Sequence, residues 1–228
     1  MILGIVGGVL LLCVLVCGGA LFASGNAFKG FASSVLQSAT QTVGAAQQTP
    51  TVNETLLYQD SMTDSPAGWT NNKQCAAKTD GYHVAGGFIC FAPNSTLTDD
   101  VDVTVTAKAV KTSSNTSYGI VFRYESQGSF YSFVITPDGQ WGVFKTINNT
   151  TTAVSEFQSN SSIRTGSGAS NTLRVQVVGA LFTCYINGQQ VGTANDATFD
   201  LGHIGLIHGD SVTTPDVVFT NLTVAKPN

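Results

Sequence analysis

The segment from Ser117 to Lys145, SYGIVFRYESQGSFYSFVITPDGQWGVFK, interleaves large apolar residues with glycine, serine and polar residues. Short segments of this kind, bounded by turn residues, are typical of β-strands. Pro137 suits the second position of a β-turn, and Gly139 suits a left-handed position in it. The segment therefore predicts three strands, including a hairpin of residues 129–136 and 140–146.

A period of two continues on both sides of this segment. In VDVTVTAKAV, residues 101–110, valines and alanines occupy one face and polar side chains the other. TLRVQVVG, residues 172–179, repeats the pattern, and Asn187-Gly188 predicts a tight hairpin because both residues tolerate positive φ. No amphipathic helix of ordinary length is apparent after residue 55. Many short strands at this spacing predict an all-β sandwich or barrel.

The charge composition argues against one class of partner. The chain has 228 residues, with 14 acidic and 10 basic side chains and a formal net charge of -4. Nucleic-acid-binding domains carry clustered Lys and Arg residues that neutralise phosphate. We therefore predict no nucleic-acid partner.

The first 23 residues, MILGIVGGVLLLCVLVCGGALFA, contain no charged side chain. An apolar helix of about 20 residues spans a bilayer, so we predict a transmembrane anchor over residues 1–23. A cleaved signal sequence is the alternative, although such signals normally have basic residues at the start and a shorter apolar core. Lipidation at Cys13 or Cys17 is disfavoured because a large residue precedes each. Gly4 and Gly8 have the GxxxG spacing of helix dimers, which predicts weak dimerisation as an option.

The three regions of the chain are predicted from these patterns. Residues 1–23 form the anchor, residues 24–54 form a juxtamembrane helix and linker, and residues 55–228 form one domain. The positive-inside rule, applied to Lys29 alone, would place the domain inside the cell. The placement of Cys75 and Cys90, which suits a disulfide, and seven N-x-S/T triplets favour export, so we expect a single-pass protein with an extracytoplasmic C-terminal domain. The triplets begin at Asn53, Asn94, Asn115, Asn148, Asn149, Asn160 and Asn221.

Three stretches together resemble a known family. Their order resembles that of the concanavalin A-like lectin/glucanase jelly roll. The three stretches are GIVFRYES…FYSFVITPDGQWGVFK, then NTLRVQVVGALFTCYINGQQVG, then HIGLIHG…VVFTNLTV. The resemblance covers about residues 56–225. Within this family, the chain is similar in particular to laminin-G-like modules and the 3-keto-disaccharide hydrolase domain. The resemblance implies a two-sheet antiparallel jelly-roll sandwich, with glycans held on a concave face or at the loop rim. These stretches belong to the scaffold, so they indicate fold more than activity.

The catalytic pattern of the glucanase branch does not carry over. That branch uses E-x-D-x-x-E, because retaining hydrolysis needs two carboxyl groups about 5–5.5 Å apart. None of the three glutamates has a second carboxylate at this spacing. The acidic pair Asp100 and Asp102 is explained by the need to keep the edge of a sheet soluble. The glutamates are Glu54, Glu125 and Glu156.

No metal site or cofactor is predicted. The histidines are His83, His203 and His208. A zinc site needs three or four converging ligands, and His203 and His208 are five positions apart on one strand, so they point to opposite faces. Asp60, Asp64 or Asp210 could supply calcium ligands, as the laminin-G resemblance implies, but no calcium-loop spacing identifies them.

The candidate ligand surface lies within the first segment. Its members are Arg123, Glu125, Tyr131, Trp141 and Lys145. Strict alternation would turn Arg123 outward in mid-sheet, where it could hold sugar hydroxyls or a carboxylate, and would turn Tyr124 toward the core. Tyr131 and Trp141 offer rigid rings for stacking on a sugar. The alternative is that both rings pack within the sandwich and that Arg123 pairs with Glu125 or another nearby carboxylate.

The cysteines of the domain suggest one disulfide. Cys75 and Cys90 flank AAKTDGYHVAGGFI and are predicted to bridge two neighbouring strands or a short loop, with two buried thiols as the alternative. Cys184, which alternates with Phe182 and Ile186, is predicted to be a buried free thiol.

Several functions remain open at this stage. The favoured one is a membrane-anchored, extracytoplasmic, non-catalytic module that binds a carbohydrate or another cell-surface polymer. A glycoside hydrolase of the 3-keto-disaccharide type and a structural or protein-interaction module are the alternatives. Clustered aromatic and amide groups on the concave face would favour binding, whereas a carboxylate pair would favour hydrolysis.

Overall fold

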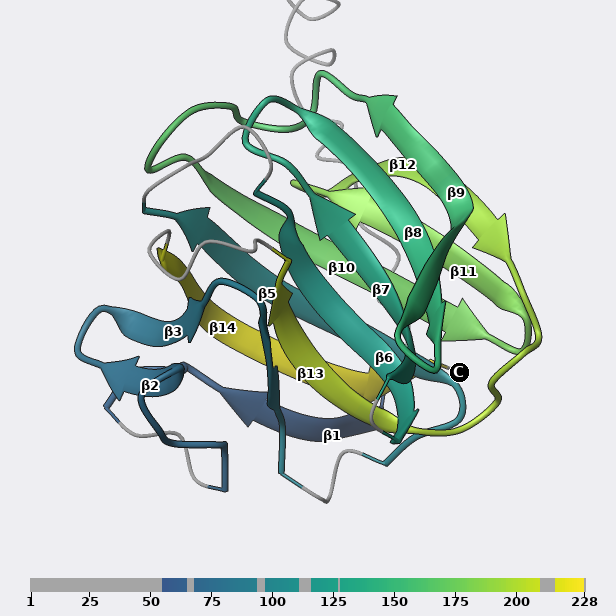
Figure 1. Cartoon of the computed structure of the whole chain (residues 1–228), viewed down its shortest axis with the longest axis horizontal. Helices are drawn as coiled ribbons and strands as arrows, with labels where there is room; N and C mark the ends of the chain where they lie inside the picture. The colour runs from purple at the N-terminus through teal and green to yellow at the C-terminus, as the bar shows by residue number, and fades with distance from the viewer. Residues whose placement is uncertain are drawn as a thin grey trace, which may run out of the picture. The chain divides into compact units, whose positions relative to one another are not determined.

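A computed structural model describes residues 55–64, 68–93, 97–110, 116–126, 128–209 and 216–227. These residues form 14 strands and no helix, arranged in two antiparallel sheets. Figure 1 shows the sheets as two layers, one behind the other. The predicted all-β, two-sheet antiparallel sandwich is therefore confirmed for the described residues.

The smaller sheet contains six strands within the described residues, and its central strands come from the segment 117–145. Its order is β4 (Phe88–Phe91), β13 (His203–His208), β6 (Tyr118–Ser126), β7 (Ser129–Ile135), β8 (Gln140–Ile147) and β9 (Thr150–Ser159). Strands β6 to β9 follow one another along the chain as a meander, and β4 and β13 complete the sheet on the other side of β6.

The larger sheet contains eight strands in the same part of the chain. Its order is β12 (Gln189–Asn195), β11 (Leu181–Ile186), β10 (Ser170–Val178), β5 (Val101–Ala109), β14 (Asp216–Lys226), β3 (Gly81–Ala85) and β2 (Cys75–Lys78). The eighth strand, β1 (Thr55–Asp60), pairs with the C-terminal half of β14.

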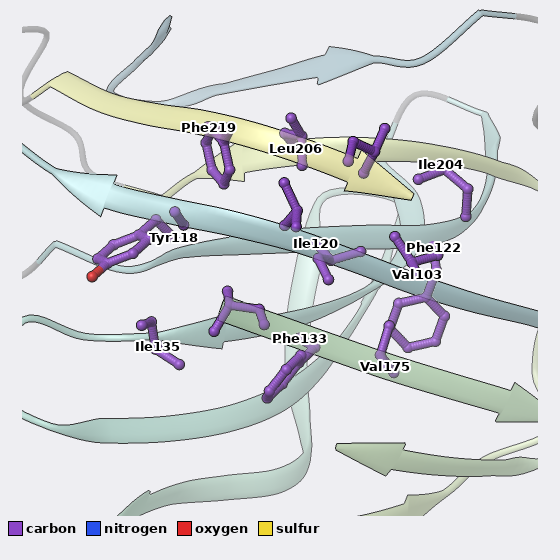
Figure 2. Packing of buried hydrophobic residues seen from close by; sticks show 14 of the residues in the cluster. Val103, Tyr118, Ile120, Phe122, Phe133, Ile135, Val175, Ile204, Leu206 and Phe219 are labelled. Atoms are coloured by element: carbon purple, nitrogen blue, oxygen red, sulfur yellow. The ribbon is translucent and has the colours of Figure 1, made fainter. Parts of the chain in front are cut away.

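The hydrophobic core lies between the sheets and consists mainly of alternate residues of the strands. In Figure 2, Ile120, Phe122 and Phe133 of the smaller sheet pack near Val103 and Val175 of the larger sheet. All five side chains are completely buried. The period of two in the sequence thus gives each sheet one apolar inner face.

Both predicted hairpins are present. Strands β7 and β8 meet at a turn in which Gly139 has φ 96°, and the backbone N–H of Thr136 donates to the carbonyl of Gln140 at 2.9 Å. Strands β11 and β12 meet at Asn187 and Gly188, with φ 52° and 81°. Positive φ at both positions is what a type I′ turn requires.

The predicted disulfide between Cys75 and Cys90 is also present. It joins β2 of the larger sheet to β4 of the smaller sheet, so it links the two layers and not two neighbouring strands of one sheet. Cys184 is a buried free thiol, as predicted, and burial raises the pKa of this thiol to about 12.

The predicted anchor, residues 1–23, and the juxtamembrane segment, residues 24–54, lie outside the described residues. Within the part of the chain that the structure describes, no helix has the length and apolar character needed to span a membrane. The anchor, the domain boundaries, the membrane location and the dimerisation through Gly4 and Gly8 therefore stay predictions.

Candidate functional site

The outer face of the six-stranded sheet is hollowed. One hollow of about 610 Å³ lies over β4, β13 and the adjoining ends of β6 to β9, and a second of about 260 Å³ lies over the centres of β7 and β8. Residues that line both hollows are Phe130, Thr146, Thr151, Ile207 and Gly209. The two hollows are therefore adjoining parts of one surface, which we call the hollowed face.

The strand register decides which side chains reach this face. Along β7, every second residue belongs to the core: Tyr131, Phe133 and Ile135. The residues between them point outward, together with the residues directly opposite in β8. These outward positions are Phe130, Ser132 and Val134 in β7 and Thr146, Phe144 and Gly142 in β8.

Aromatic rings stand on both sides of the hollowed face. Phe91 of β4 and Tyr124 of β6 have ring centroids 4.2 Å apart. Phe144 of β8 and Phe157 of β9 have centroids 4.9 Å apart. Phe130 of β7 lies between these pairs, with its centroid 6.2 Å from that of Tyr124. Rings this close prefer offset or tilted contact, which fixes their positions before any ligand arrives.

Glycines allow the rings to approach the sheet. A Cβ atom at Gly142 would lie 2.7 Å from a ring carbon of Phe144, and one at Gly205 would lie 3.2 Å from a ring carbon of Phe91. A Cβ atom at Gly119 would lie 2.0 Å from the carbonyl oxygen of Phe133. Larger residues at these positions would displace the rings or the backbone, so the glycines help to keep the face hollow.

The polar groups of the hollowed face are mainly hydroxyls. The hydroxyl oxygens of Thr146 and Thr151 lie 2.9 Å apart and share a hydrogen bond. Ser117 and Ser132 line the smaller hollow, and Asn149 and His208 line the larger one. The His208 side chain is fully buried, with Nδ1 3.0 Å from the carbonyl oxygen of Val84. Among the described lining residues, none is Asp, Glu, Lys or Arg. The face can therefore stack and hydrogen-bond, but these residues supply no pair of carboxyl groups for acid–base chemistry.

Arg123, the first of the predicted ligand residues, is turned into the sandwich. The pairing of β6 with β7 is irregular after Phe122, and Arg123 has φ 50°. Its guanidinium is 3% exposed and donates to the carbonyl of Phe199 at 2.9 Å and to that of Asp99 at 3.3 Å. A Cβ atom at Gly202 would lie 2.3 Å from the Arg123 carbonyl carbon, so only glycine fits against this bulge.

Tyr131 and Lys145 lie opposite each other in the register and also face inward. The Tyr131 hydroxyl donates to Asp196 Oδ1 at 2.6 Å, and Lys145 Nζ donates to Asp196 Oδ2 at 2.5 Å and to the Thr198 hydroxyl at 2.9 Å. Burial alone would raise the pKa of Asp196, but the hydrogen bonds from Lys145, Thr198 and Tyr131 hold this pKa well below its usual range. These contacts fasten the connection between β12 and β13 to the smaller sheet.

Trp141 belongs to the core. Its side chain is 2% exposed and packs edge-on against Phe133, with ring centroids 6.2 Å apart. A Cβ atom at Gly192 of β12 would lie 2.6 Å from the indole ring, so β12 approaches Trp141 closely at this glycine. Glu125 lies exposed near the end of β6.

The structure therefore separates the five predicted ligand residues. Arg123, Tyr131 and Lys145 meet around one loop from its inner side, Trp141 is buried elsewhere, and Glu125 is exposed. The packing of Tyr131 and Trp141, and the approach of the Arg123 guanidinium to Asp100 Oδ1 at 3.7 Å, correspond to the alternative that the sequence left open. The role of these residues toward a ligand stays a prediction.

The expectation that Tyr124 faces the core was wrong. Strict alternation holds as far as Phe122, and the bulge at Arg123 then reverses it, so that Tyr124 reaches the hollowed face. The sequence patterns did not single out Phe91, Phe130, Phe144 and Phe157 as surface residues. Their alternation with core residues was the available signal, but an exposed aromatic face and a buried one have the same pattern in sequence.

The acidic pair of the sequence has a structural role on the other sheet. Asp102 is 3% exposed and accepts hydrogen bonds from Arg174 Nε at 2.8 Å and from Gln176 Nε2 at 3.1 Å. Asp100 accepts the backbone N–H of Gly179 at 2.8 Å. No group of three or more His, Cys, Asp or Glu side chains that could hold a metal ion occurs among the described residues.

No protein-family model and no curated protein sequence matches the chain. Solved structures do match it. The carbohydrate-binding module CBM66 from Bacillus subtilis has a TM-score of 0.60 and 19% identity, covering 72% of this chain and 97% of that chain. A protein of unknown function with a galectin-like fold, also from Bacillus subtilis, has a TM-score of 0.58 and 10% identity, covering 75% and 96%.

A third similar structure is the xylan β-1,4-xylosidase from Bacillus halodurans, with a TM-score of 0.55 and 11% identity. The match covers 74% of this chain but only 39% of the xylosidase. Identities this low show a shared fold. The likeness to a galectin-like fold agrees with the lectin-like sandwich that the sequence predicted.

Proposed function

We propose that the β-sandwich domain is a non-catalytic carbohydrate-binding module that holds a glycan on the hollowed face. The observation that carries the proposal is the composition of this face: aromatic and aliphatic side chains, glycines and polar groups that are mainly hydroxyls, without Asp, Glu, Lys or Arg among the described lining residues. Binding sites of this kind combine apolar contact area with a few placed polar groups. The similarity to a carbohydrate-binding module and to a galectin-like fold supports the proposal.

The location is part of the same proposal. The apolar segment 1–23 would anchor the chain in a membrane, and the domain would lie on the extracytoplasmic side. The disulfide between Cys75 and Cys90 supports this side, because disulfides persist in oxidising compartments. A module held in this way would keep a glycan or a cell-surface polymer close to the membrane.

A binding assay with two matched variants tests the proposal. The full-length protein in detergent micelles is titrated with a panel of soluble polysaccharides, and released reducing ends are measured in parallel. Tyr124→Ala removes a ring from the hollowed face, whereas Leu181→Ala removes an exposed side chain from the other sheet. We expect Tyr124→Ala to weaken binding about tenfold, as hot-spot truncations do, and Leu181→Ala to leave it unchanged.

Two results would contradict the proposal. Steady release of reducing ends would show a hydrolase, the alternative that the sequence left open. Equal binding by both variants and the parent would place the ligand on another surface. Thermal melting of each variant confirms that the comparison is made between folded proteins.

A further inference from the structure

The two aromatic pairs of the hollowed face are widely separated. The pair Phe91 and Tyr124 belongs to β4 and β6, and the pair Phe144 and Phe157 belongs to β8 and β9. Strands β4 and β9 are the two edges of the sheet. Neighbouring strands lie about 4.8 Å apart, so the strands of Phe91 and Phe157 are about 24 Å apart and those of Tyr124 and Phe144 about 10 Å apart. A single sugar ring cannot cover both pairs.

A strip of outward positions beside the pairs is low. In the register, Gly119 of β6 lies opposite Val134 of β7, and Val134 lies opposite Gly142 of β8. Two of these three adjacent positions therefore carry no side chain. Phe130, which lies between the pairs, is 8% exposed and lines both hollows. An extended ligand can cross the strands here without moving the backbone.

The rings beside this strip are placed to offer their flat sides. Phe144 lies against Gly142 of its own strand, and Phe91 lies against Gly205 of β13, with the contacts given above. A ring held over a glycine leans along the sheet instead of standing out from it. Flat apolar surfaces match the ring faces of sugars whose hydroxyls are equatorial, because axial C–H groups make those faces apolar.

The charge of the lining residues also limits which ligands can bind. The described lining residues include no Asp, Glu, Lys or Arg, and Thr146 and Thr151 hydrogen-bond each other. Lys145 is a neighbour of these residues in β8, but its ammonium group binds Asp196 on the inner side. A charged ligand would lose hydration on this face without gaining an ion pair from the described lining residues, which is unfavourable.

From these observations we infer that the ligand is an uncharged, extended chain of β-linked sugars with equatorial hydroxyls, which crosses the strands and contacts both aromatic pairs. This inference rests on the proposed carbohydrate-binding function. It adds the length, the charge and the stereochemistry of the ligand. Binding is then driven by stacking and by hydroxyl contacts, and it does not depend on salt.

The test uses β-1,4-linked glucose oligosaccharides from the dimer to the hexamer, and the same series oxidised to carboxylates at C6. Calorimetry on the full-length protein in micelles is done at about 0.05 M and about 0.5 M NaCl, which changes the screening length several-fold. We expect affinity to rise at least tenfold from dimer to hexamer and to change by less than threefold with salt. The oxidised hexamer should bind at least tenfold more weakly.

One variant tests whether the pair Phe144 and Phe157 contributes to hexamer binding. Phe157 is 40% exposed, so Phe157→Ala should leave the fold intact. It should weaken hexamer binding about tenfold and make the affinity nearly independent of chain length beyond the shorter oligosaccharides. Leu181→Ala, at 45% exposure on the other sheet, is the matched control and should bind as the parent does.

The outcomes separate the inference from the proposed function. Tighter binding of the oxidised series, or a steep loss with salt, overturns the uncharged ligand but leaves a carbohydrate-binding module. Equal affinity for dimer and hexamer overturns the extended ligand. A failure to bind either series or any polysaccharide of the panel overturns both proposals.

Discussion

The two outer faces of the sandwich have opposite chemical character. On the larger sheet, Asp102 is buried beneath Arg174 and Gln176, and the Arg174 guanidinium lies 4.9 Å from the centre of the Tyr185 ring. On the smaller sheet, the hollows of the outer face are lined mainly by aromatic and aliphatic side chains, glycines and hydroxyls. Both faces belong to strands with the same period of two.

This difference supports the proposed ligand surface. Rings that lie over glycines beside two hollows offer apolar contact area of the kind that ligand sites use. The predictions below test this contrast, in order of decreasing effect on stability.

The largest effect is expected at Trp141, on the inner side of the smaller sheet. Trp141→Ala should lower the free energy of unfolding by about 3–5 kcal/mol, because a large buried ring leaves a cavity. Urea denaturation measures this loss. Glycan affinity of the remaining folded protein should stay close to that of the parent. Loss of affinity with an unchanged unfolding midpoint would instead support the ligand role that the sequence predicted for this residue.

The next largest effect on stability is expected from the disulfide that joins the two sheets. Cys75 and Cys90 are 15 positions apart, and replacing both by serine should cost about 3 kcal/mol in the chain-entropy model. Glycan binding should weaken as well, because β4 carries Phe91 and borders the larger hollow. Denaturation with and without reductant provides the measurement for the parent. Identical midpoints would show that the disulfide adds nothing.

On the outer face of the larger sheet, Asp102→Ala should cost about 2–3 kcal/mol, because it leaves Arg174 beside a desolvated site without its partner. Replacing both residues, as Asp102→Leu with Arg174→Met, should recover most of this loss. Glycan affinity should be unchanged in both proteins. Reduced affinity in the folded variants would show that this face, too, contributes to binding.

The smallest effect on stability is expected when the pH is lowered. The pKa of Asp196 is held below its unfolded value of about 3.9 by Lys145, Thr198 and Tyr131. Its contribution to stability is therefore present above about pH 4 and is lost as the pH falls toward the folded pKa. The melting temperature should decline over this range, and Asp196→Asn should reduce the slope. A parallel decline in both proteins would assign the acid sensitivity to other carboxylates.

The sequence was a good guide wherever the alternation was regular. Strand β5, the two hairpins and the buried Cys184 all agree with it. In these segments, local backbone preference and the burial of one face act together, so neighbouring residues contain most of the information. The pairing of Cys75 with Cys90 was also found, but the sequence could not show that it joins two sheets.

The candidate site depended on contacts that local patterns do not contain. A bulge at Arg123, packed against the backbone of Gly202, reverses the faces of β6 and exchanges the expected places of Arg123 and Tyr124. Phe133 and Phe144 look alike in sequence, yet one lies in the core and the other on the hollowed face. The sequence by itself determined the strands, the turns and the sandwich, because these follow from periodicity and backbone conformation. Only the tertiary structure decided which face of each strand the second sheet covers, because this depends on residues far apart in the chain.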